Sequence, residues 1–210
     1  MLGIHPQDCP GWEYEDEHEN ARVTVILPRV AHLMANISVA PGELVVKVCD
    51  TRTTHEFLFK GLTPSGHKYF AGHYRGEDFK CLKHYGVCIP ADPMVGIPPQ
   101  NVLFKMQILK KDISGGISGI FSAQALPNAL LPEKQKLYYL VCFCARVFQE
   151  LLTIHPYANG NGHMARYVVV LILTHFGFRP KRWAVEPKPA SKVYSQSIAA
   201  HRRGHVQALE

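Results

Sequence analysis

One short segment of the chain concentrates the residue types that could do chemistry. Residues 155–166 run His-Pro-Tyr-Ala-Asn-Gly-Asn-Gly-His-Met-Ala-Arg, a histidine followed by small and amide residues and closed by an arginine. A neutral histidine suits proton transfer near neutral pH because its reference pKa is about 6.5. His155 is therefore a candidate general base, and a histidine that only hydrogen-bonds a turn is the alternative.

The middle of this segment is suited to binding an anion. Residues 160–162, Gly-Asn-Gly, come shortly before an apolar run over residues 167–176 that stops at Gly177, which predicts a helix. The first N–H groups of a helix lack intrahelical partners, and the helix dipole adds positive potential there. Small residues let an anion approach, and Arg166 would lean toward the same place. A plain turn between helices is the alternative.

A second helix is expected on the upstream side. Apolar residues recur there at three- and four-residue steps, which predicts an amphipathic helix that starts at about Pro132. Its apolar positions are Leu137, Leu140, Val141, Cys144, Val147, Phe148, Leu151 and Leu152. The chemical segment is thus expected to be a loop between two buried helices.

Residues 155–166 resemble the signature of the Fic family, His-Pro-Phe-x-Asp/Glu-Gly-Asn-Gly-Arg-x-x-Arg. The histidine, the proline, both glycines, the intervening asparagine and the last arginine match, and Tyr157 is a conservative change. Two positions depart from the pattern: Asn159 stands where the family has an acid, and His163 where it has its first arginine. The resemblance extends more weakly over about residues 43–200.

A stretch nearer the N-terminus is also similar to the family. Residues 54–59, Thr-His-Glu-Phe-Leu-Phe, and residues 71–75, Ala-Gly-His-Tyr-Arg, resemble its Ile-His-x-x-Leu-Phe and Ala-Gly-x-x-Arg. The next residues take the place of the family's flap, whose edge strand docks the target by strand addition. Short apolar runs predict a β-hairpin over residues 78–89. The resemblance assigns target docking to Arg75, Gly76, Glu77, Asp78, Phe79 and Lys80.

The resemblance implies a protein adenylyltransferase, which transfers AMP from ATP to a Ser, Thr or Tyr hydroxyl of a target protein. His155 would be the general base, and Gly162 favours nucleotidyl transfer because the related Doc kinases have a lysine in its place. The expected phosphate-binding residues are Gly160, Asn161, Gly162, His163 and Arg166. Asn159 would ligate Mg²⁺, although an amide oxygen lacks the charge of a carboxylate.

The two departures leave other functions open. A Fic-fold transferase of UMP or phosphocholine is one alternative, and a catalytically weak or silent Fic protein that binds a nucleotide or a partner is another. Histidine replaces the planar, always-charged fork of arginine only when it is protonated. The family's inhibitory pattern, Ser/Thr-x-x-x-Glu-Gly/Asn, is absent, because Glu15 precedes the Glu19-Asn20 pair where a hydroxyl is needed. A separate antitoxin-like inhibitor is the expected source of control, unless none is needed.

The composition predicts one mainly α domain. The chain has 210 residues, 47% hydrophobic and 19% charged, which indicates many buried helices. We expect a Fic-type core of about six to eight helices with a small β-hairpin flap. Polar and acidic residues 1–20 are predicted to be a flexible N-terminal arm, and residues 21–210 a single domain. Helices are expected within 21–40, over 43–59 and 101–111, in the pair around the loop and from about Ala190, with a Gly/Ser-rich connection over 112–131.

Charge and cysteine content bear on partners and location. The net charge is +6, and the basic residues of 179–203 could steer a triphosphate or an acidic partner. We expect no nucleic-acid or membrane partner, since the longest apolar run is too short to span a bilayer. Six cysteines without a Cys-x-x-Cys pair predict free thiols and a cytoplasmic protein. The sequence leaves open whether it is exported into a host cell and which oligomer it forms.

Overall fold

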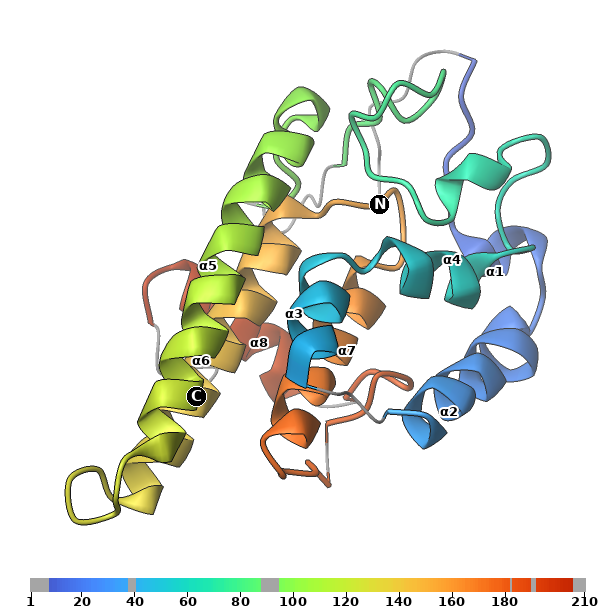
Figure 1. Ribbon diagram of the computed structural model, residues 1–210. Coiled ribbons are helices and arrows are strands. Elements are labelled where there is room, and N and C mark those ends of the chain that lie inside the picture. The colour runs from blue at the N-terminus through green and yellow to red at the C-terminus, as the bar shows by residue number, and fades with distance from the viewer. Residues whose placement is uncertain (1–7, 38–40, 88–94, 182, 190–191, 206–210) are drawn as a thin grey trace.

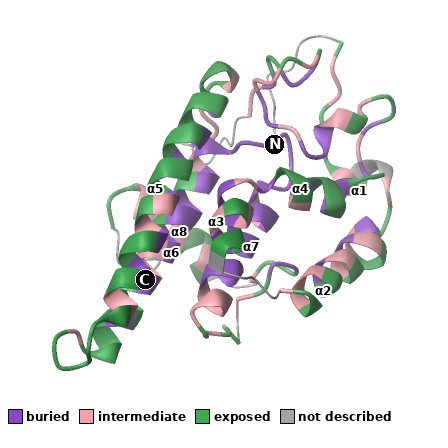
Figure 2. Cartoon of the chain, viewed as in Figure 1, coloured by how far each residue is buried: buried purple, intermediate pink, exposed green. Residues whose placement is uncertain are grey.

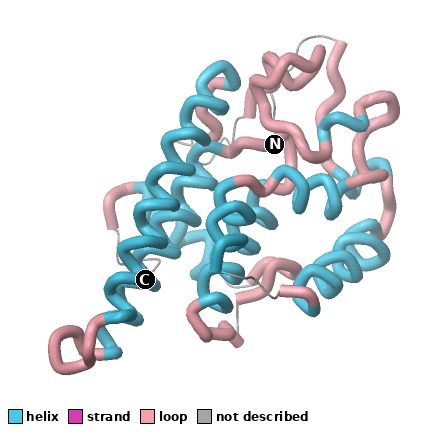
Figure 3. Tube along the Cα trace, viewed as in Figure 1, coloured by secondary structure: helices cyan, strands magenta, loops and turns pink. Residues whose placement is uncertain are grey.

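The computed structural model describes residues 8–37, 41–87, 95–181, 183–189 and 192–205, and this part of the chain is helical with no strand (Figures 1 and 3). The prediction of a mainly α fold is confirmed. The α-helices are α1 (Tyr14–Glu17), α2 (Leu27–Ala35), α3 (Pro41–Cys49), α4 (Arg52–Phe59), α5 (Pro99–Ala125), α6 (Glu133–Ile154), α7 (Asn161–His175) and α8 (Lys192–Arg202). A π-helical turn, Arg22–Ile26, leads into α2, and a 3₁₀ turn, Lys68–Phe70, follows α4.

The helix pair α6 and α7 forms the centre of the molecule. They pack on each other, α5 covers α6, and α3 lies against both α5 and α7. Residues 163–172 of α7 are all buried, which is why this helix is apolar on every side (Figure 2). The loop between α6 and α7 is therefore carried by two helices of the buried core. α6 also has the length and apolar composition to cross a membrane, a property that core helices share.

Several expected helices are confirmed. α2 lies within residues 21–40 with Pro28 in its first turn, the position that tolerates a missing N–H. α6 starts after Pro132, and Gly177 follows α7 with a φ of +85°. Ala190 itself lies outside the described residues, and α8 is described from Lys192.

The helix expected over residues 101–111 is longer than predicted. α5 continues through the Gly/Ser-rich stretch to Ala125, so the predicted connection over 112–131 is wrong for residues 112–125. Ile113, Ile117 and Ile120 are buried at helical spacing, and their packing outweighs the poor helix propensity of the glycines. Gly116 also has a packing reason, because a Cβ there would meet the Phe143 ring of α6 at 2.2 Å.

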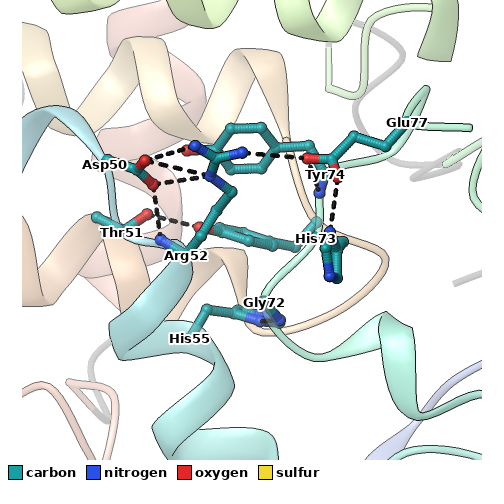
Figure 4. A network of polar contacts seen from close by, with 9 residues as sticks. Asp50, Thr51, Arg52, His55, Gly72, His73, Tyr74 and Glu77 are labelled. Carbon is teal, nitrogen blue, oxygen red and sulfur yellow. Dashed lines mark hydrogen bonds and ion pairs between the residues drawn. The ribbon is translucent and has the colours of Figure 1, made fainter.

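The helix expected over residues 43–59 is split into α3 and α4. Asp50 lies at the break, where its Oδ1 accepts hydrogen bonds from the backbone N–H and the Nε of Arg52. An aspartate that bonds the backbone two residues on competes with a continuous helix. The break matters for the site, because Thr51 and His55 then face the loop between α6 and α7 (Figure 4).

The β-hairpin expected over residues 78–89 is not confirmed. Residues 76–85 form a series of turns, and residues 88–94 lie outside the described part of the chain. The turns are closed by local backbone bonds, such as Gly76 N–H to Leu82 O and Lys83 N–H to Phe79 O, instead of a ladder. The buried Leu82 and Tyr85 hold this segment to the core.

The N-terminal segment differs from the flexible arm expected for residues 1–20. In its described part, the Trp12 side chain is only 4% exposed, and its Nε1 donates to Leu62 O at 2.8 Å. Burying an indole removes on the order of 200 Å² from water, worth several kcal/mol. A Cys9–Cys81 disulfide joins the segment to the turns of the flap, so the expectation of free thiols is wrong for this pair.

Candidate active site

The loop begins where α6 ends in a left-handed turn. His155 has φ 53° and ψ 61°, a conformation that non-glycine residues adopt only when the surroundings impose it. Arg75 imposes it here: its guanidinium donates to His155 O at 2.7 Å and to Ile154 O at 3.0 Å. The backbone N–H of Arg75 also donates to Pro156 O at 2.7 Å.

The imidazole of His155 is set up as a neutral base. Its Nδ1 lies 3.2 Å from Leu152 O, and because a carbonyl only accepts, Nδ1 carries the proton. Nε2 then has its lone pair free, and it is buried with no hydrogen-bond partner in the described structure. Burial, and secondarily the charge of Arg75, lower the pKa of His155 to about 4. The imidazole is therefore uncharged, with its one proton on Nδ1, at pH values around neutrality.

A second buried histidine braces the far side of the loop. The backbone N–H of Gly72 donates to His55 Nδ1 at 3.0 Å (Figure 4). His55 Nε2 therefore carries the proton and donates to Asn159 O at 2.9 Å. The His55 ring stacks on Tyr157, whose hydroxyl lies 2.8 Å from Thr51 Oγ1. Burial lowers the pKa of His55 to about 3, so this link is neutral.

In the turn into α7, the backbone of the loop lies close to neighbouring side chains. Gly160 has φ +78°, and a Cβ there would meet the Phe59 ring at 2.3 Å. Asn161 was expected to bind phosphate with its side chain, but its amide is used within the loop: Oδ1 accepts from Tyr157 N–H and Nδ2 donates to Tyr157 O, both at 2.8 Å. The capacity of this turn to bind an anion therefore lies in the first N–H groups of α7. Gly162 has no side chain that would block an anion from reaching these N–H groups.

The two expected phosphate-binding side chains face a buried carboxylate. Glu186 Oε2 lies 2.9 Å from His163 Nε2 and 3.8 Å from an Arg166 nitrogen, and Glu186 Oε1 pairs with Arg22. Burial alone would raise the pKa of Glu186, but the bonds from His163 and Arg22 outweigh it and lower that pKa. Arg166 also donates from Nε to Val185 O at 2.8 Å, so the segment after α7 is anchored to it.

These groups share one cavity of about 260 Å³. The expected residues His155, Asn159, Gly160, Asn161, Gly162, His163 and Arg166 all line it. The N-terminal segment and the segment after α7 form the rest of its wall, with Glu13, Tyr14, Glu15, Arg22, Glu186 and Lys188. The structure thus brings together every loop residue that was predicted and adds charged groups that were not.

Asn159, the expected metal ligand, is held by the N-terminal segment. Its Nδ2 donates to Trp12 O at 2.8 Å and to Glu13 Oε2 at 3.0 Å, and its Oδ1 accepts from Gly160 N–H. The orientation of the amide is therefore defined by three partners. Among the described residues, no group of three His, Cys, Asp or Glu side chains is placed to hold a metal ion.

The expected docking residues of the flap do not line this cavity. Arg75 is fully buried and uses its donors on backbone carbonyls, so its assignment to target docking is wrong. Glu77 accepts from the Tyr74 N–H and from His73, and lies 3.6 Å from Arg52 (Figure 4). Phe79 stacks on Tyr69. Among the flap residues assigned to docking, Asp78 and Lys80 are exposed. Gly76 is half-buried and has a φ of +86°, and a Cβ there would clash with Pro99 O.

The chain matches no protein-family model and no curated protein. The functional argument therefore depends on the geometry of the cavity and on the motif at its centre. Sequence reasoning missed Glu13, Arg22 and Glu186, which come from segments without a motif. Trp12 was the available signal for Glu13, because a tryptophan in an acidic stretch is usually buried in the core.

Proposed function

We propose that this protein is a Fic-type adenylyltransferase that transfers AMP from ATP to a Ser, Thr or Tyr hydroxyl of a target protein. The observation that carries the proposal is the Nε2 of His155, a buried base without a partner, in the cavity that the N-terminus of α7 also lines. A base beside an anion-binding helix terminus is the pair of groups that phosphoryl chemistry requires.

The proposed step follows from these two groups. The target hydroxyl gives its proton to His155 Nε2 while its oxygen forms a bond to the α-phosphorus of ATP. The bond from that phosphorus to the bridging oxygen of the β-phosphate breaks, and pyrophosphate leaves. The first N–H groups of α7 would stabilise the negative charge on the phosphate oxygens, and Arg166 would hold the outer phosphates.

Beside the loop, a magnesium ion that arrives with ATP would find one suitable side-chain oxygen, on the carboxylate of Glu13. Asn159 turns its Nδ2 toward Glu13 and its Oδ1 toward Gly160 N–H, so the amide oxygen does not face the same place. When bound, the ion would neutralise phosphate charge. The residues of the chain then have to orient the phosphates and keep His155 neutral.

A silent nucleotide- or partner-binding protein is the second candidate. The position of Glu186 favours it, because this buried carboxylate lies 2.9 Å from His163 Nε2 and 3.8 Å from an Arg166 nitrogen, where a phosphate was expected. Transfer of UMP or phosphocholine remains a variant of the first proposal, since the loop geometry constrains the phosphates and not the group attached to them.

Mass spectrometry separates these functions. The protein is incubated with a cell lysate and with ATP, UTP or CDP-choline, and peptides of the lysate and of the protein itself are searched for AMP, UMP and phosphocholine adducts. An AMP adduct that His155→Asn abolishes supports the proposal, and another adduct reassigns the donor. Nucleotide binding by calorimetry without any adduct identifies the silent nucleotide-binding protein, and the absence of both adducts and nucleotide binding refutes the transferase proposals.

A further inference from the structure

A second cavity, larger than the one at the loop, lies at the C-terminal end of α7. It has a volume of about 640 Å³, compared with about 260 Å³ at the loop, and the two cavities have no described lining residue in common. The end of α2, the end of α7 and the segment after α7 form its wall. A volume of this size is typical of pockets that hold a small molecule, about 300–1,000 Å³.

Most of the side chains around this second cavity are apolar. They are Met34, Ala35, Ile37, Val170, Pro180 and Trp183. The indole of Trp183 is fixed in place, because its Nε1 donates to Arg166 O at 3.3 Å and its ring packs on Phe148 with centroids 5.1 Å apart. Since its one polar group is already bonded, Trp183 offers a ligand only carbon surface. The cavity therefore suits a hydrocarbon body.

Arg179 gives the cavity a positive charge that no lining side chain offsets. No aspartate or glutamate is among the described residues that line it. In the described part of the chain no carboxylate pairs with Arg179, and the exposed Lys181 follows it two positions later. The cavity at the loop differs, because Glu186 pairs with Arg22 there. A guanidinium beside apolar walls attracts an anion and can hold a carboxylate through two hydrogen bonds.

The end of α7 limits the charge that a ligand can carry. Thr174 and His175, in the last turn of this helix, line the cavity. The last carbonyl groups of a helix have no intrahelical partner and carry partial negative charge. They would repel a di- or triphosphate, whereas a single carboxylate can lie beside Arg179. The two ends of α7 therefore suit different classes of ligand.

We propose that this second cavity binds a small amphipathic carboxylic acid, with its carboxylate on the guanidinium of Arg179 and its hydrocarbon chain against Trp183. The apolar wall excludes water from the chain, and the arginine selects an acid over a neutral molecule of the same shape. The inference does not depend on the proposed adenylyl transfer, because no residue of this cavity takes part in that step.

Calorimetry with octanoate tests the site, at concentrations below those at which octanoate forms micelles. We expect saturable binding to the wild type and binding at least about tenfold weaker to Arg179→Met, which keeps an unbranched side chain but loses one charge-assisted contact. The neutral octan-1-ol should bind equally weakly to both. Arg203→Met changes an exposed arginine after α8 and should bind octanoate as the wild type does.

Fluorescence tests whether the ligand lies in this cavity. Bromine on the last carbon of the octanoate chain quenches a tryptophan that it contacts, and the chain has two tryptophans, Trp12 and Trp183. The brominated acid should quench the wild type but not Trp183→Phe, in which only the buried Trp12 emits. The inference fails if octanoate does not bind saturably to the wild type, if octan-1-ol binds the wild type as tightly as octanoate does, or if quenching persists in Trp183→Phe.

Discussion

At the scale of single residues, His155 combines three properties that chance would not bring together. It is the C-cap residue that follows α6, it adopts a left-handed conformation, and its two ring nitrogens are differentiated by Leu152 O. The backbone conformation turns the chain out of the helix, and the hydrogen bond selects the tautomer with a free Nε2. Arg75 contributes by holding the carbonyls on either side of this turn.

His155→Asn is expected to abolish transfer while keeping the fold. Asparagine tolerates the left-handed conformation but cannot accept a proton at neutral pH, so the rate should fall by about 10²- to 10⁴-fold. The measurement is adduct formation on the target by mass spectrometry, with thermal unfolding as the control for the fold. A variant that modifies its target at the wild-type rate removes His155 from the base role.

Glu186→Gln is expected to strengthen nucleotide binding. The carboxylate faces His163 and Arg166, so it competes with phosphate for them and repels it. Removing the charge should lower the dissociation constant of ATP about tenfold, equivalent to ~1.4 kcal/mol. Glu150→Gln, an exposed acid on α6, is the control. Unchanged or weaker binding would mean that Glu186 organises the two side chains for phosphate instead of competing with it.

The loop residues were predictable because their chemistry is local. A histidine, glycines before a helix and an arginine one turn later have meaning at their spacing alone, and all of them line the cavity. Arg75 was assigned wrongly because an arginine in a turn-rich stretch resembles a surface residue, and its carbonyl partners come from three separate segments. Glu186 gave no signal, since its partners lie 20 or more positions away.

At the scale of elements, the helices predicted from periodicity are present, and the error in α5 lies where glycine was taken as a breaker. α5 continues through three glycines and three serines because one of its faces is buried against α6. Glycine in a helix has two uses that sequence alone does not separate: it ends the helix, or it lets a neighbour come close. Gly116 has the second use, against Phe143.

Two neighbouring glycines of α5 provide a matched test. A Cβ at Gly115 meets nothing within 4 Å, whereas a Cβ at Gly116 meets the Phe143 ring at 2.2 Å. Gly115→Ala should therefore raise the free energy of unfolding by up to about 1 kcal/mol, the helix-propensity gain. Gly116→Ala should lower it by about 1–3 kcal/mol through overpacking. Urea unfolding measures both, and equal effects of the two variants would contradict the close contact of α5 and α6.

At the scale of the whole molecule, the segments that complete the site come from both ends of the described chain. Glu13 and Arg22 precede the helical core, and Glu186 follows α7. Sequence analysis could not anticipate this arrangement, because burial of Trp12 and pairing of Cys9 with Cys81 are long-range events. Six cysteines allow 15 full pairings, so no single disulfide follows from the sequence. The fold class could be predicted from the composition. The way in which these two segments complete the site could not.

The buried histidines make the stability of the whole molecule depend on pH. The pKa values of His55 and His155 are lowered to about 3 and about 4 by burial, and that of His163 is also lowered. Below their ordinary value of about 6.5, the unfolded chain binds protons that the folded chain does not. The free energy of unfolding should therefore be highest above pH 6.5 and fall as the pH drops toward 4, by up to about 1.4 kcal/mol per pH unit for each histidine.

His155→Asn separates one of these contributions from the rest. Urea unfolding between pH 7 and pH 5 should give a shallower loss of stability for the variant than for the wild type, because one group no longer titrates. The difference in slope should approach that of one proton, about 1.4 kcal/mol per pH unit near pH 5. Parallel curves for the wild type and His155→Asn would mean that the imidazole takes up its proton in the folded state, and a base protonated at that pH could not start the proposed transfer.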